Sequence, residues 1–398
     1  MVEPASLDAQ LIDAAAAQGD TPAAGRVFLD SAGSSLPPSA VVDAVVGHLR
    51  REAEIGGYRA AAERRDDLEA GYGLLADFLG CAPDEVAFTD SATRSWLSLL
   101  DAIPLGPGDR VLTTEAEYGG NAIPLLRVAD QAGFSVEPVP SGPDGSIDLD
   151  ALRGALDERV RLVSLVHVPT NGGLVNPVAE VAAAAHGVGA LVLLDACQSF
   201  GQLPLSLAGT GVDMITATGR KWLRGPRGTG VLAVRRDVLA RLRPRLVDLR
   251  GAVWTGLREV ELRADARVLE LWEHSVADRL GLLAAVRYAS DLGVDRIAAS
   301  VGDRAARLRA GLAEVPGVTV RDIGAQRCGL VSFTVDGRSA EHVRDALADR
   351  DVTVTVSSLP STRYDMTRRA LPQVVRASPH YFVSHAQIDT AVGAVADL

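Results

Sequence analysis

The feature that most constrains the fold of this chain is an alternation of short apolar runs with longer segments of helical periodicity. The apolar runs predict strands over Glu85–Phe88, Arg110–Thr113, Ser135–Val139, Arg161–His167, Leu191–Leu194, Met214–Ala217 and Gly230–Val234. The segments around them predict helices over Ser39–Glu54, Glu63–Leu79, Thr93–Ala102, Asn121–Ala132, Leu149–Asp157 and Val178–Gly187. This alternation predicts an α/β fold in which helices cover a large, mostly parallel sheet.

The pattern changes after residue 260, where the regular alternation ends. We expect a long helix over Val268–Leu292, followed by helix, strand, helix and strand between Ile297 and Val356. A short strand over Val374–Ser378 and a last helix from His385 complete the expected elements. The sequence therefore predicts three parts: an N-terminal arm (1–27), a large domain (28–260), and a bridging helix with a smaller C-terminal α+β domain (261–398).

Composition argues against several classes of function. The net charge is −11, which disfavours nucleic acid as a partner because phosphate backbones attract basic proteins. The three cysteines, Cys81, Cys197 and Cys328, are far apart and show no spacing typical of a metal site or a disulfide framework. No targeting segment and no membrane-spanning run is recognisable, so we expect a soluble, cytoplasmic protein without a metal centre.

Lysine is almost absent from the chain: 39 of its 40 basic residues are arginine, and Lys221 is the single lysine. Arginine replaces lysine readily on a solvated surface, whereas only an amine can lose its proton and form an imine with a carbonyl group. The neighbouring residues Arg224 and Arg227 show that basic positions close to Lys221 use arginine. The retention of this one amine indicates a chemical role for Lys221.

Polar clusters follow four of the predicted strands, at the edge where ligands of open α/β sheets gather. The clusters are Asp90–Trp96, His167–Gly173, Asp195–Gln198 and Thr218–Gly230. Lys221 supplies an amine for an imine, Asp195 supplies a carboxylate for a ring nitrogen, and the helix start after Ser91 supplies N–H groups for a phosphate. These are the binding needs of pyridoxal 5'-phosphate.

With these motifs the sequence resembles the class V aminotransferases of pyridoxal phosphate fold type I. The resemblance runs from Phe28-Leu29-Asp30-Ser31-Ala32-Gly33 almost to the C-terminus. It implies that Lys221 forms the Schiff base with the cofactor, that Asp195 pairs with the pyridinium nitrogen, and that Gln198 donates to the phenolic oxygen. Further cofactor contacts implied by the resemblance are Ala92, Thr93, Thr218 and Arg220 at the phosphate, Tyr118 over the ring and Asn171 near the phenolic oxygen.

The same resemblance implies contacts to an amino-acid substrate and to a second subunit. Arg376 would bind the substrate carboxylate through a bidentate pair, with Asn171 close to the substrate. Tyr58 and Arg59 lie in a segment similar to an active-site segment of some relatives. Thr255 resembles a residue that reaches the phosphate of the partner subunit, which implies a homodimer. His167 and His380 are expected to be structural histidines.

Within the family, the sequence is most similar to the isopenicillin N epimerase-like and hercynylcysteine sulfoxide lyase-like subgroup, which includes lincosamide-pathway enzymes that act on cysteine S-conjugates. This implies β-elimination from a cysteine S-conjugate in secondary metabolism, such as antibiotic biosynthesis. Cysteine desulfurases carry a nucleophilic cysteine shortly before the segment of Arg376, and residues 354–371 contain none. Decarboxylation with oxidative deamination, transamination and epimerisation stay open, as do the roles of Arg59 and Arg363.

Overall fold

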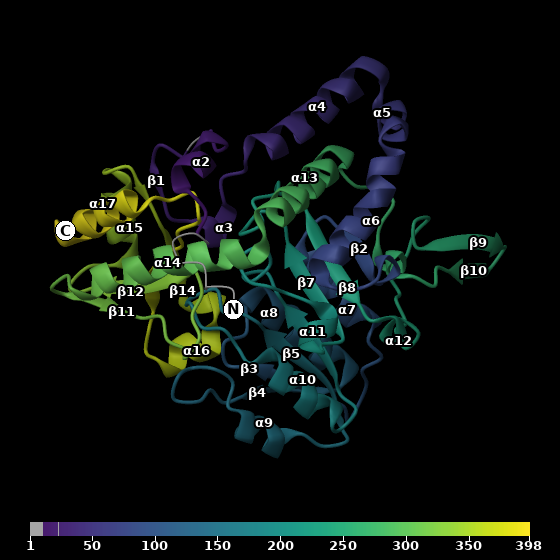
Figure 1. Cartoon of the computed structure of the whole chain (residues 1–398). Helices are drawn as coiled ribbons and strands as arrows, with labels where there is room; N and C mark the ends of the chain where they lie inside the picture. Colours follow the sequence, from purple (N-terminus) through teal and green to yellow (C-terminus); the bar gives the residue numbers. More distant parts are fainter. Residues whose placement is uncertain (1–10, 23) are drawn as a thin grey trace, which may run out of the picture.

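The computed structural model describes residues 11–22 and 24–398, and a seven-stranded sheet forms its centre (Figure 1). In spatial order the strands are β2 (Val86–Thr89), β8 (Gly230–Val234), β7 (Met214–Thr218), β6 (Leu191–Asp195), β5 (Val160–Val166), β3 (Arg110–Thr114) and β4 (Ser135–Val139). Strand β8 is antiparallel to both of its neighbours, and the other pairs are parallel. The predicted α/β fold with a mostly parallel sheet is confirmed, and all seven predicted strands are present.

The central strands β5, β6, β7 and β8 are largely apolar because helices cover both faces of the sheet. Strand β6 illustrates this: Val192 and Leu194 belong to one buried cluster, while Leu191 and Leu193 belong to another. One face packs against α6 (Arg65–Leu79), α10 (Val178–His186) and α13 (Val276–Leu292), and the other against α7 (Ala92–Ala102) and α8 (Gly119–Ala132). The carboxyl ends of the parallel strands therefore form the open edge at which a site can develop.

Six further helices complete this part of the described chain. They are α4 (Ser39–Ile55), α5 (Gly57–Glu63), η1 (Pro83–Glu85), α9 (Leu149–Ala155), α11 (Leu207–Thr210) and α12 (Arg236–Leu239). Helix α5 is absent from the sequence prediction, and its side chains are largely exposed. Among the described residues, no helix combines the length and the apolar character that a membrane span requires.

The C-terminal part builds a four-stranded antiparallel sheet in the order β11 (Val318–Val320), β12 (Val331–Val335), β15 (Gln373–Ala377) and β14 (Thr355–Ser358). Its other elements are η2 (Ala266–Leu269), α14 (Val294–Ala313), α15 (Ala340–Ala348), β13 (Val352–Thr353), η3 (Leu359–Ser361), α16 (Arg363–Arg368) and α17 (His385–Ala396). The predicted last helix, which starts at His385, is confirmed. Strand β15 carries Arg376 toward the junction with the large sheet.

The N-terminal segment packs on the C-terminal part of the chain. It contains α2 (Ala14–Gly19), β1 (Val27–Phe28) and α3 (Ser31–Ser34), and β1 pairs in parallel with β13. Gln18 donates from its amide to the carbonyl of Phe382 and to Gln387. These contacts bring Asp30, which follows β1, beside the end of β15. The division of the chain at residue 28 stays a prediction.

The predicted helix over Val268–Leu292 is wrong at its start. Residues 266–269 form η2, and α13 begins only at Val276, where the Ser275 hydroxyl caps the helix by accepting from the Asp278 N–H. Glu270, which directly follows η2, has an extended backbone, and its buried carboxylate is held by ion pairs with Arg250 and Arg279. Long-range electrostatics thus override a local helical pattern.

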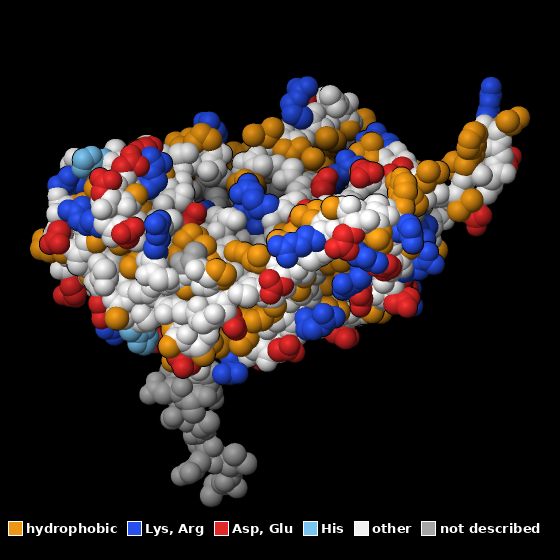
Figure 2. All heavy atoms as spheres, turned by 90° about the horizontal axis from the view of Figure 1, so that it is seen from above, with side chains coloured by type: hydrophobic (Ala, Val, Ile, Leu, Met, Phe, Trp, Pro, Cys, Tyr) orange, Lys and Arg blue, Asp and Glu red, His pale blue; other side chains and the backbone are white. Residues whose placement is uncertain are grey.

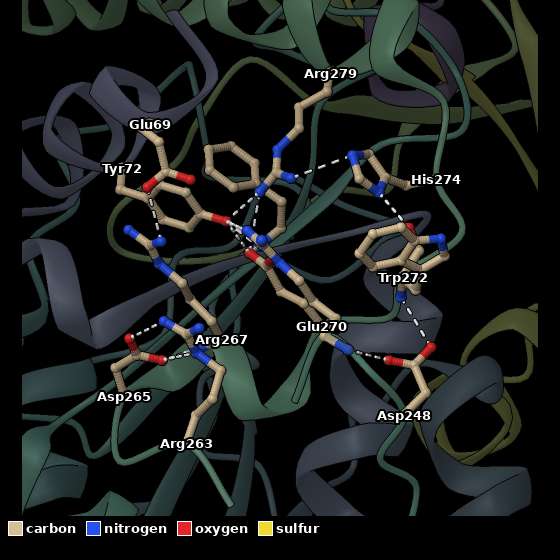
Figure 3. A network of polar contacts seen from close by, with 12 residues as sticks. Glu69, Tyr72, Asp248, Arg263, Asp265, Arg267, Glu270, Trp272, His274 and Arg279 are labelled. Atoms are coloured by element: carbon tan, nitrogen blue, oxygen red, sulfur yellow. Dashed lines mark hydrogen bonds and ion pairs between the residues drawn. The ribbon is translucent and has the colours of Figure 1, made fainter. Parts of the chain in front are cut away.

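Figure 3 shows the polar network around Glu270. The Tyr72 hydroxyl lies 2.8 Å from Glu270 Oε1, and Arg250 and Arg279 donate to the Tyr72 oxygen over 2.6 Å and 2.7 Å. Phe88 donates its backbone N–H to Glu270 Oε1. The network joins α6, β2 and α13 to the root of a hairpin formed by β9 (Ala252–Gly256) and β10 (Glu259–Leu262), which the sequence prediction missed.

Candidate active site

A cavity lined by many polar side chains lies at the carboxyl ends of β5, β6 and β7. It is lined by residues from segments far apart in the sequence: Ser91, Ala92, Thr93, Tyr118, Asn121, Val166, Val168, Thr170, Asp195, Cys197, Gln198, Thr218, Arg220 and Lys221. The structure therefore brings together most of the residues that the sequence proposed as cofactor contacts.

Lys221 lies in the turn that follows β7 and lines the cavity. Burial lowers the pKa of the Lys221 amine, against the opposing effects of Cys197 and Asp195. A lowered pKa increases the fraction of neutral amine at neutral pH, and the neutral amine is the form that attacks a carbonyl or accepts a proton. The single lysine of the chain therefore lines the cavity as an amine whose pKa is lowered, which fits the predicted role of Lys221.

Asp195 is the last residue of β6 and is buried. Its Oδ1 accepts the Cys197 backbone N–H over 2.9 Å, and its Oδ2 accepts from the Asn121 amide over 2.7 Å. Because a carboxylate has about four lone-pair sites, two stay available to a cationic N–H group in the cavity. Asp195 therefore fits the predicted role of partner to a pyridinium nitrogen.

The N-terminus of α7 opens into the cavity and provides an anion site. The Ser91 hydroxyl caps this helix by accepting the Arg94 N–H over 3.1 Å. The N–H groups of the first turn lack partners within the helix, and Ala92 and Thr93 both line the cavity. Arg220, across the cavity, also donates to the Gly33 carbonyl. These groups fit a phosphate.

The orientation of the Gln198 side-chain amide is fixed by Trp222. The Trp222 indole N–H, which can only donate, bonds to Gln198 Oε1 over 2.9 Å. Gln198 Nε2 in turn donates to the Ala32 carbonyl over 3.1 Å and to Thr170 Oγ1 over 3.5 Å. A phenolic oxygen in the cavity would therefore take the place of the longer contact, to Thr170, as acceptor for Gln198 Nε2.

Arg376 lies next to the cavity, buried behind Thr170. Its Nη1 donates to Thr170 Oγ1 over 2.9 Å, and its Nη2 forms an ion pair with Asp30 Oδ1 at 3.2 Å. Its Nε is buried without a hydrogen-bond partner. Because an unpaired buried donor costs free energy, the arginine is poised for an additional acceptor such as a substrate carboxylate.

Several residues proposed from the sequence lie outside the cavity. Asn171 is buried with its amide donating to Asp365 Oδ2, and the neighbouring Thr170 lines the cavity instead. Tyr58 and Arg59 project from α5, where Tyr58 is 87% exposed. Thr255 lies on the exposed hairpin β9–β10, and Arg363 begins α16 on the surface.

Burial shifts the pKa values of a histidine and a cysteine near the site toward their neutral forms. Burial lowers the pKa of His167 to about 4, and its Nδ1 lies 2.9 Å from the Ser199 hydroxyl. His380 Nε2 lies 2.9 Å from the Trp222 carbonyl. Burial raises the pKa of the Cys197 thiol well above its usual range. Both histidines fill structural positions, as expected.

Sequence reasoning missed four residues that shape the site. Asn121 and the buried Glu117 support Asp195 from α8 and the turn before it, while Asp30 and Thr170 contact Arg376. Glu117 precedes Tyr118 directly and Asn121 follows it in the first turn of α8, so these polar residues next to a predicted cofactor contact could have been recognised from the sequence. No sequence pattern could have identified Asp30 as a contact of Arg376, because the two residues are 346 positions apart in the chain.

A family model described as "Aminotransferase class-V" matches residues 27–390. The chain belongs to the class-V aminotransferase family. Among its relatives in this family, the "Probable cysteine desulfurase 2" of Mycobacterium leprae is 33% identical over 96% of each chain. The "Probable hercynylcysteine sulfoxide lyase" of Mycobacterium tuberculosis is 32% identical over 90% of this chain and 86% of its own.

Solved structures of class-V proteins share the fold. A C-DES mutant with glycine covalently linked to the PLP cofactor is 25% identical, with a TM-score of 0.86 over 96% of this chain and 99% of its own. The apo cysteine desulfurase of Thermococcus onnurineus NA1, at 24% identity, has a TM-score of 0.88 over 96% of both chains. The expected fold type I is therefore confirmed. Membership of the sulfoxide lyase-like subgroup stays a prediction.

The cofactor of this class-V enzyme is pyridoxal 5'-phosphate. The cavity fits the group chemically: it combines a buried amine at Lys221, a carboxylate at Asp195, an amide donor at Gln198 and a helix N-terminus at Ala92. Each donor or acceptor matches one functional group of the cofactor: aldehyde, pyridine nitrogen, phenolic oxygen and phosphate. Within the described residues, no group of three or more His, Cys, Asp or Glu side chains is arranged to hold a metal ion.

Proposed function

We propose that the protein is a C–S lyase that cleaves a cysteine S-conjugate of secondary metabolism by β-elimination. The overall reaction takes up one water and yields pyruvate, ammonia and the free thiol. The relatives support a cysteine-related substrate, since they include desulfurases and a probable hercynylcysteine sulfoxide lyase. When bound, pyridoxal 5'-phosphate supplies an electron sink that stabilises negative charge at the substrate α-carbon.

Lys221 is the proposed catalytic base. It would hold the cofactor between turnovers and, once a substrate amine replaces it, its own amine would take the proton from the α-carbon. The lowered pKa of Lys221 favours the neutral amine that this step requires. The protonated Lys221 then lies close to the leaving sulfur and can donate the proton to it.

The remaining residues bind and orient. Asp195, Gln198, Ala92, Thr93, Thr218, Arg220 and Tyr118 are the proposed cofactor contacts, all of which line the cavity. Arg376 would take the substrate carboxylate through its free Nε together with Nη2, which at present pairs with Asp30. This fixes the α-carbon near Lys221, and orientation of this kind is a large part of catalysis.

The observation that favours a lyase over a desulfurase is the state of the three thiols. A desulfurase must transfer sulfur to its own thiolate, yet burial raises the pKa of Cys81 to about 12, that of Cys328 to about 11 and that of Cys197 well above its usual value. A thiol with a raised pKa is a poor nucleophile because little thiolate is present. The raised pKa values of the thiols therefore support a lyase, in which the sulfur would leave with its own substituent as a thiol.

A substrate assay tests this proposal. Incubation of the holoenzyme with several cysteine S-conjugates is expected to release pyruvate and thiol in a one-to-one ratio. The variant with Cys81, Cys197 and Cys328 all replaced by alanine should retain most of this turnover, since none of the thiols takes part. Carbon dioxide and an aldehyde as products would contradict β-elimination in favour of oxidative decarboxylation.

Cysteine desulfurase is the second candidate function, favoured by the 33% identical relative and by the position of Cys197 in the cavity. It predicts that free cysteine is converted to alanine and that the single substitution Cys197→Ala abolishes this conversion. Alanine formation that depends on Cys197 would replace the lyase proposal. The cofactor assignment stands in either case.

We also propose that the active unit is a homodimer in which the β9–β10 hairpin packs on the partner. The hairpin exposes Val253, Trp254, Leu257 and Val260 by 62%, 70%, 96% and 63%, and it stands out from the surface in Figure 2. A two-stranded hairpin without cover is only marginally stable in water, and an apolar patch of this kind marks an interface. Thr255 on this hairpin would then reach the partner's phosphate site, and Tyr58 and Arg59 on α5 the partner's substrate.

Light scattering tests the dimer. The wild-type protein is expected to show twice the chain mass, and the double variant Trp254→Glu/Leu257→Glu is expected to be monomeric because two charges would be buried in the interface. Arg258→Ala at the hairpin tip is the matched control and should leave the mass unchanged. A wild-type mass equal to one chain would contradict the proposal.

A further inference from the structure

The buried carboxylate of Glu117 lies beside Asp195 and is unused by the mechanism above. Glu117 is 1% exposed, and each of its carboxylate oxygens accepts two hydrogen bonds. Oε2 accepts from the hydroxyls of Thr113 and Ser164 over 2.7 Å and 2.8 Å. Oε1 accepts from the Tyr118 N–H over 2.8 Å and from the Asn121 amide over 3.1 Å. Four donors converge on this group, which is the arrangement that an ionised carboxylate needs.

Asn121 links the two buried carboxylates. Its Nδ2 donates one hydrogen to Glu117 Oε1 and the other to Asp195 Oδ2. The amide therefore has no freedom to rotate: turning it would place its carbonyl oxygen against two carboxylates. Through Asn121, the position of Glu117 fixes the orientation of the Asp195 carboxylate in the cavity.

We propose that Glu117 and Asn121 are positioning residues that orient Asp195 toward the cofactor ring nitrogen, and that the negative charge of Glu117 strengthens the hold of Asp195 on the protonated ring. A second carboxylate just behind the first increases the negative potential at the site of the positive charge. The inference rests on the role of Asp195 in the proposed function.

The strengthening depends on pH in a defined direction. Burial raises the pKa of Glu117 to about 7, with Asp195 adding to the increase. Glu117 is thus ionised above pH 7, where it supports Asp195, and neutral below pH 7, where it does not. The other charged or ionisable groups around Asp195 include Lys221, Cys197 and Arg220, and they are the same in wild type and in Glu117→Gln. A comparison of the two proteins at each pH therefore isolates the charge at position 117.

The test is the dissociation constant of pyridoxal 5'-phosphate, measured at pH 5.5 and pH 8.5 for wild type and the isosteric variant Glu117→Gln. We expect the variant to bind about tenfold more weakly than wild type at pH 8.5 and within about twofold at pH 5.5. Glutamine fits this position because its amide NH2 group, in the place of Oε2, can donate to the hydroxyls of Thr113 and Ser164, which accept as well as donate. The exposed residue Glu180 provides the control Glu180→Gln, which should match wild type at both pH values.

Two further variants separate the possible failures. Asn121→Ser is expected to weaken cofactor binding at both pH values, because the orientation of Asp195 is lost. If Glu117→Gln does not fold, Asn121→Ser still tests whether the link between Glu117 and Asp195 matters. Asp195→Asn must weaken binding more than either. If Asp195→Asn alone weakens binding, the role of Glu117 and Asn121 is overturned while the proposed function stands. If Asp195→Asn binds like wild type, the assignment of Asp195 fails and the inference with it.

Discussion

Replacement of Lys221 by alanine is expected to reduce turnover by at least about 10³-fold, because the variant loses both the amine that holds the cofactor and the base that takes the α-proton. No other lysine exists in the chain to substitute for it. The apo form should fold normally, since removal of a buried amine whose pKa is lowered by burial relieves a desolvation cost. Turnover and the visible absorbance of covalently bound cofactor are the two measurements.

Lys221→Arg is the informative companion to this variant. It keeps a positive charge in the cavity, but a guanidinium stays protonated and cannot form an imine. The two variants should therefore be equally inactive. Turnover retained by Lys221→Arg would contradict a nucleophilic role and leave only an electrostatic one, while pyridoxal 5'-phosphate bound covalently to Lys221→Ala would show that another group holds it.

Replacement of Arg376 by alanine is expected to lower kcat/KM for an amino-acid substrate by about 100-fold, mainly through KM, because a bidentate charge-assisted contact is lost. Arg376→Lys should recover only part of this loss, since an ammonium keeps the charge but not the fork. Steady-state kinetics with a substrate and with its carboxamide analogue measure the effect. The carboxamide should bind the wild type and Arg376→Ala about equally.

Asp30→Asn is expected to change KM in the opposite direction and serves as the control for Arg376→Ala. Asp30 pairs with Arg376 Nη2 at 3.2 Å and so competes with an incoming carboxylate. Asparagine keeps an oxygen for the backbone N–H of Gly33 but removes the charge, and KM is therefore expected to fall by about threefold. A rise in KM in Asp30→Asn would contradict competition between Asp30 and the substrate carboxylate, and would show instead that Asp30 orients Arg376 for binding.

The sequence was most informative where local chemistry decides the outcome. The strands that end at Asp195 and Thr218 are apolar along most of their length, and this composition predicted that they lie in the interior of the sheet. Only an interior strand of a sheet that is covered by helices buries its side chains on both faces. Lys221 was identified because it is the single lysine in the sequence. The start of α13 was predicted wrongly because Glu270 is held by Arg250 and Arg279, and such pairings are set by packing between distant segments.

The sequence by itself determined the fold class, the place of the single lysine and the polar groups that surround it, because each depends on residue type and on order along a strand. Only the tertiary structure decided how these groups are tuned. It placed Asn121 between Glu117 and Asp195, paired Asp30 with Arg376, and moved Tyr58 and Thr255 away from the cavity of their own chain. These contacts join residues from different elements, and their energy comes from burial and proximity, which no local pattern records.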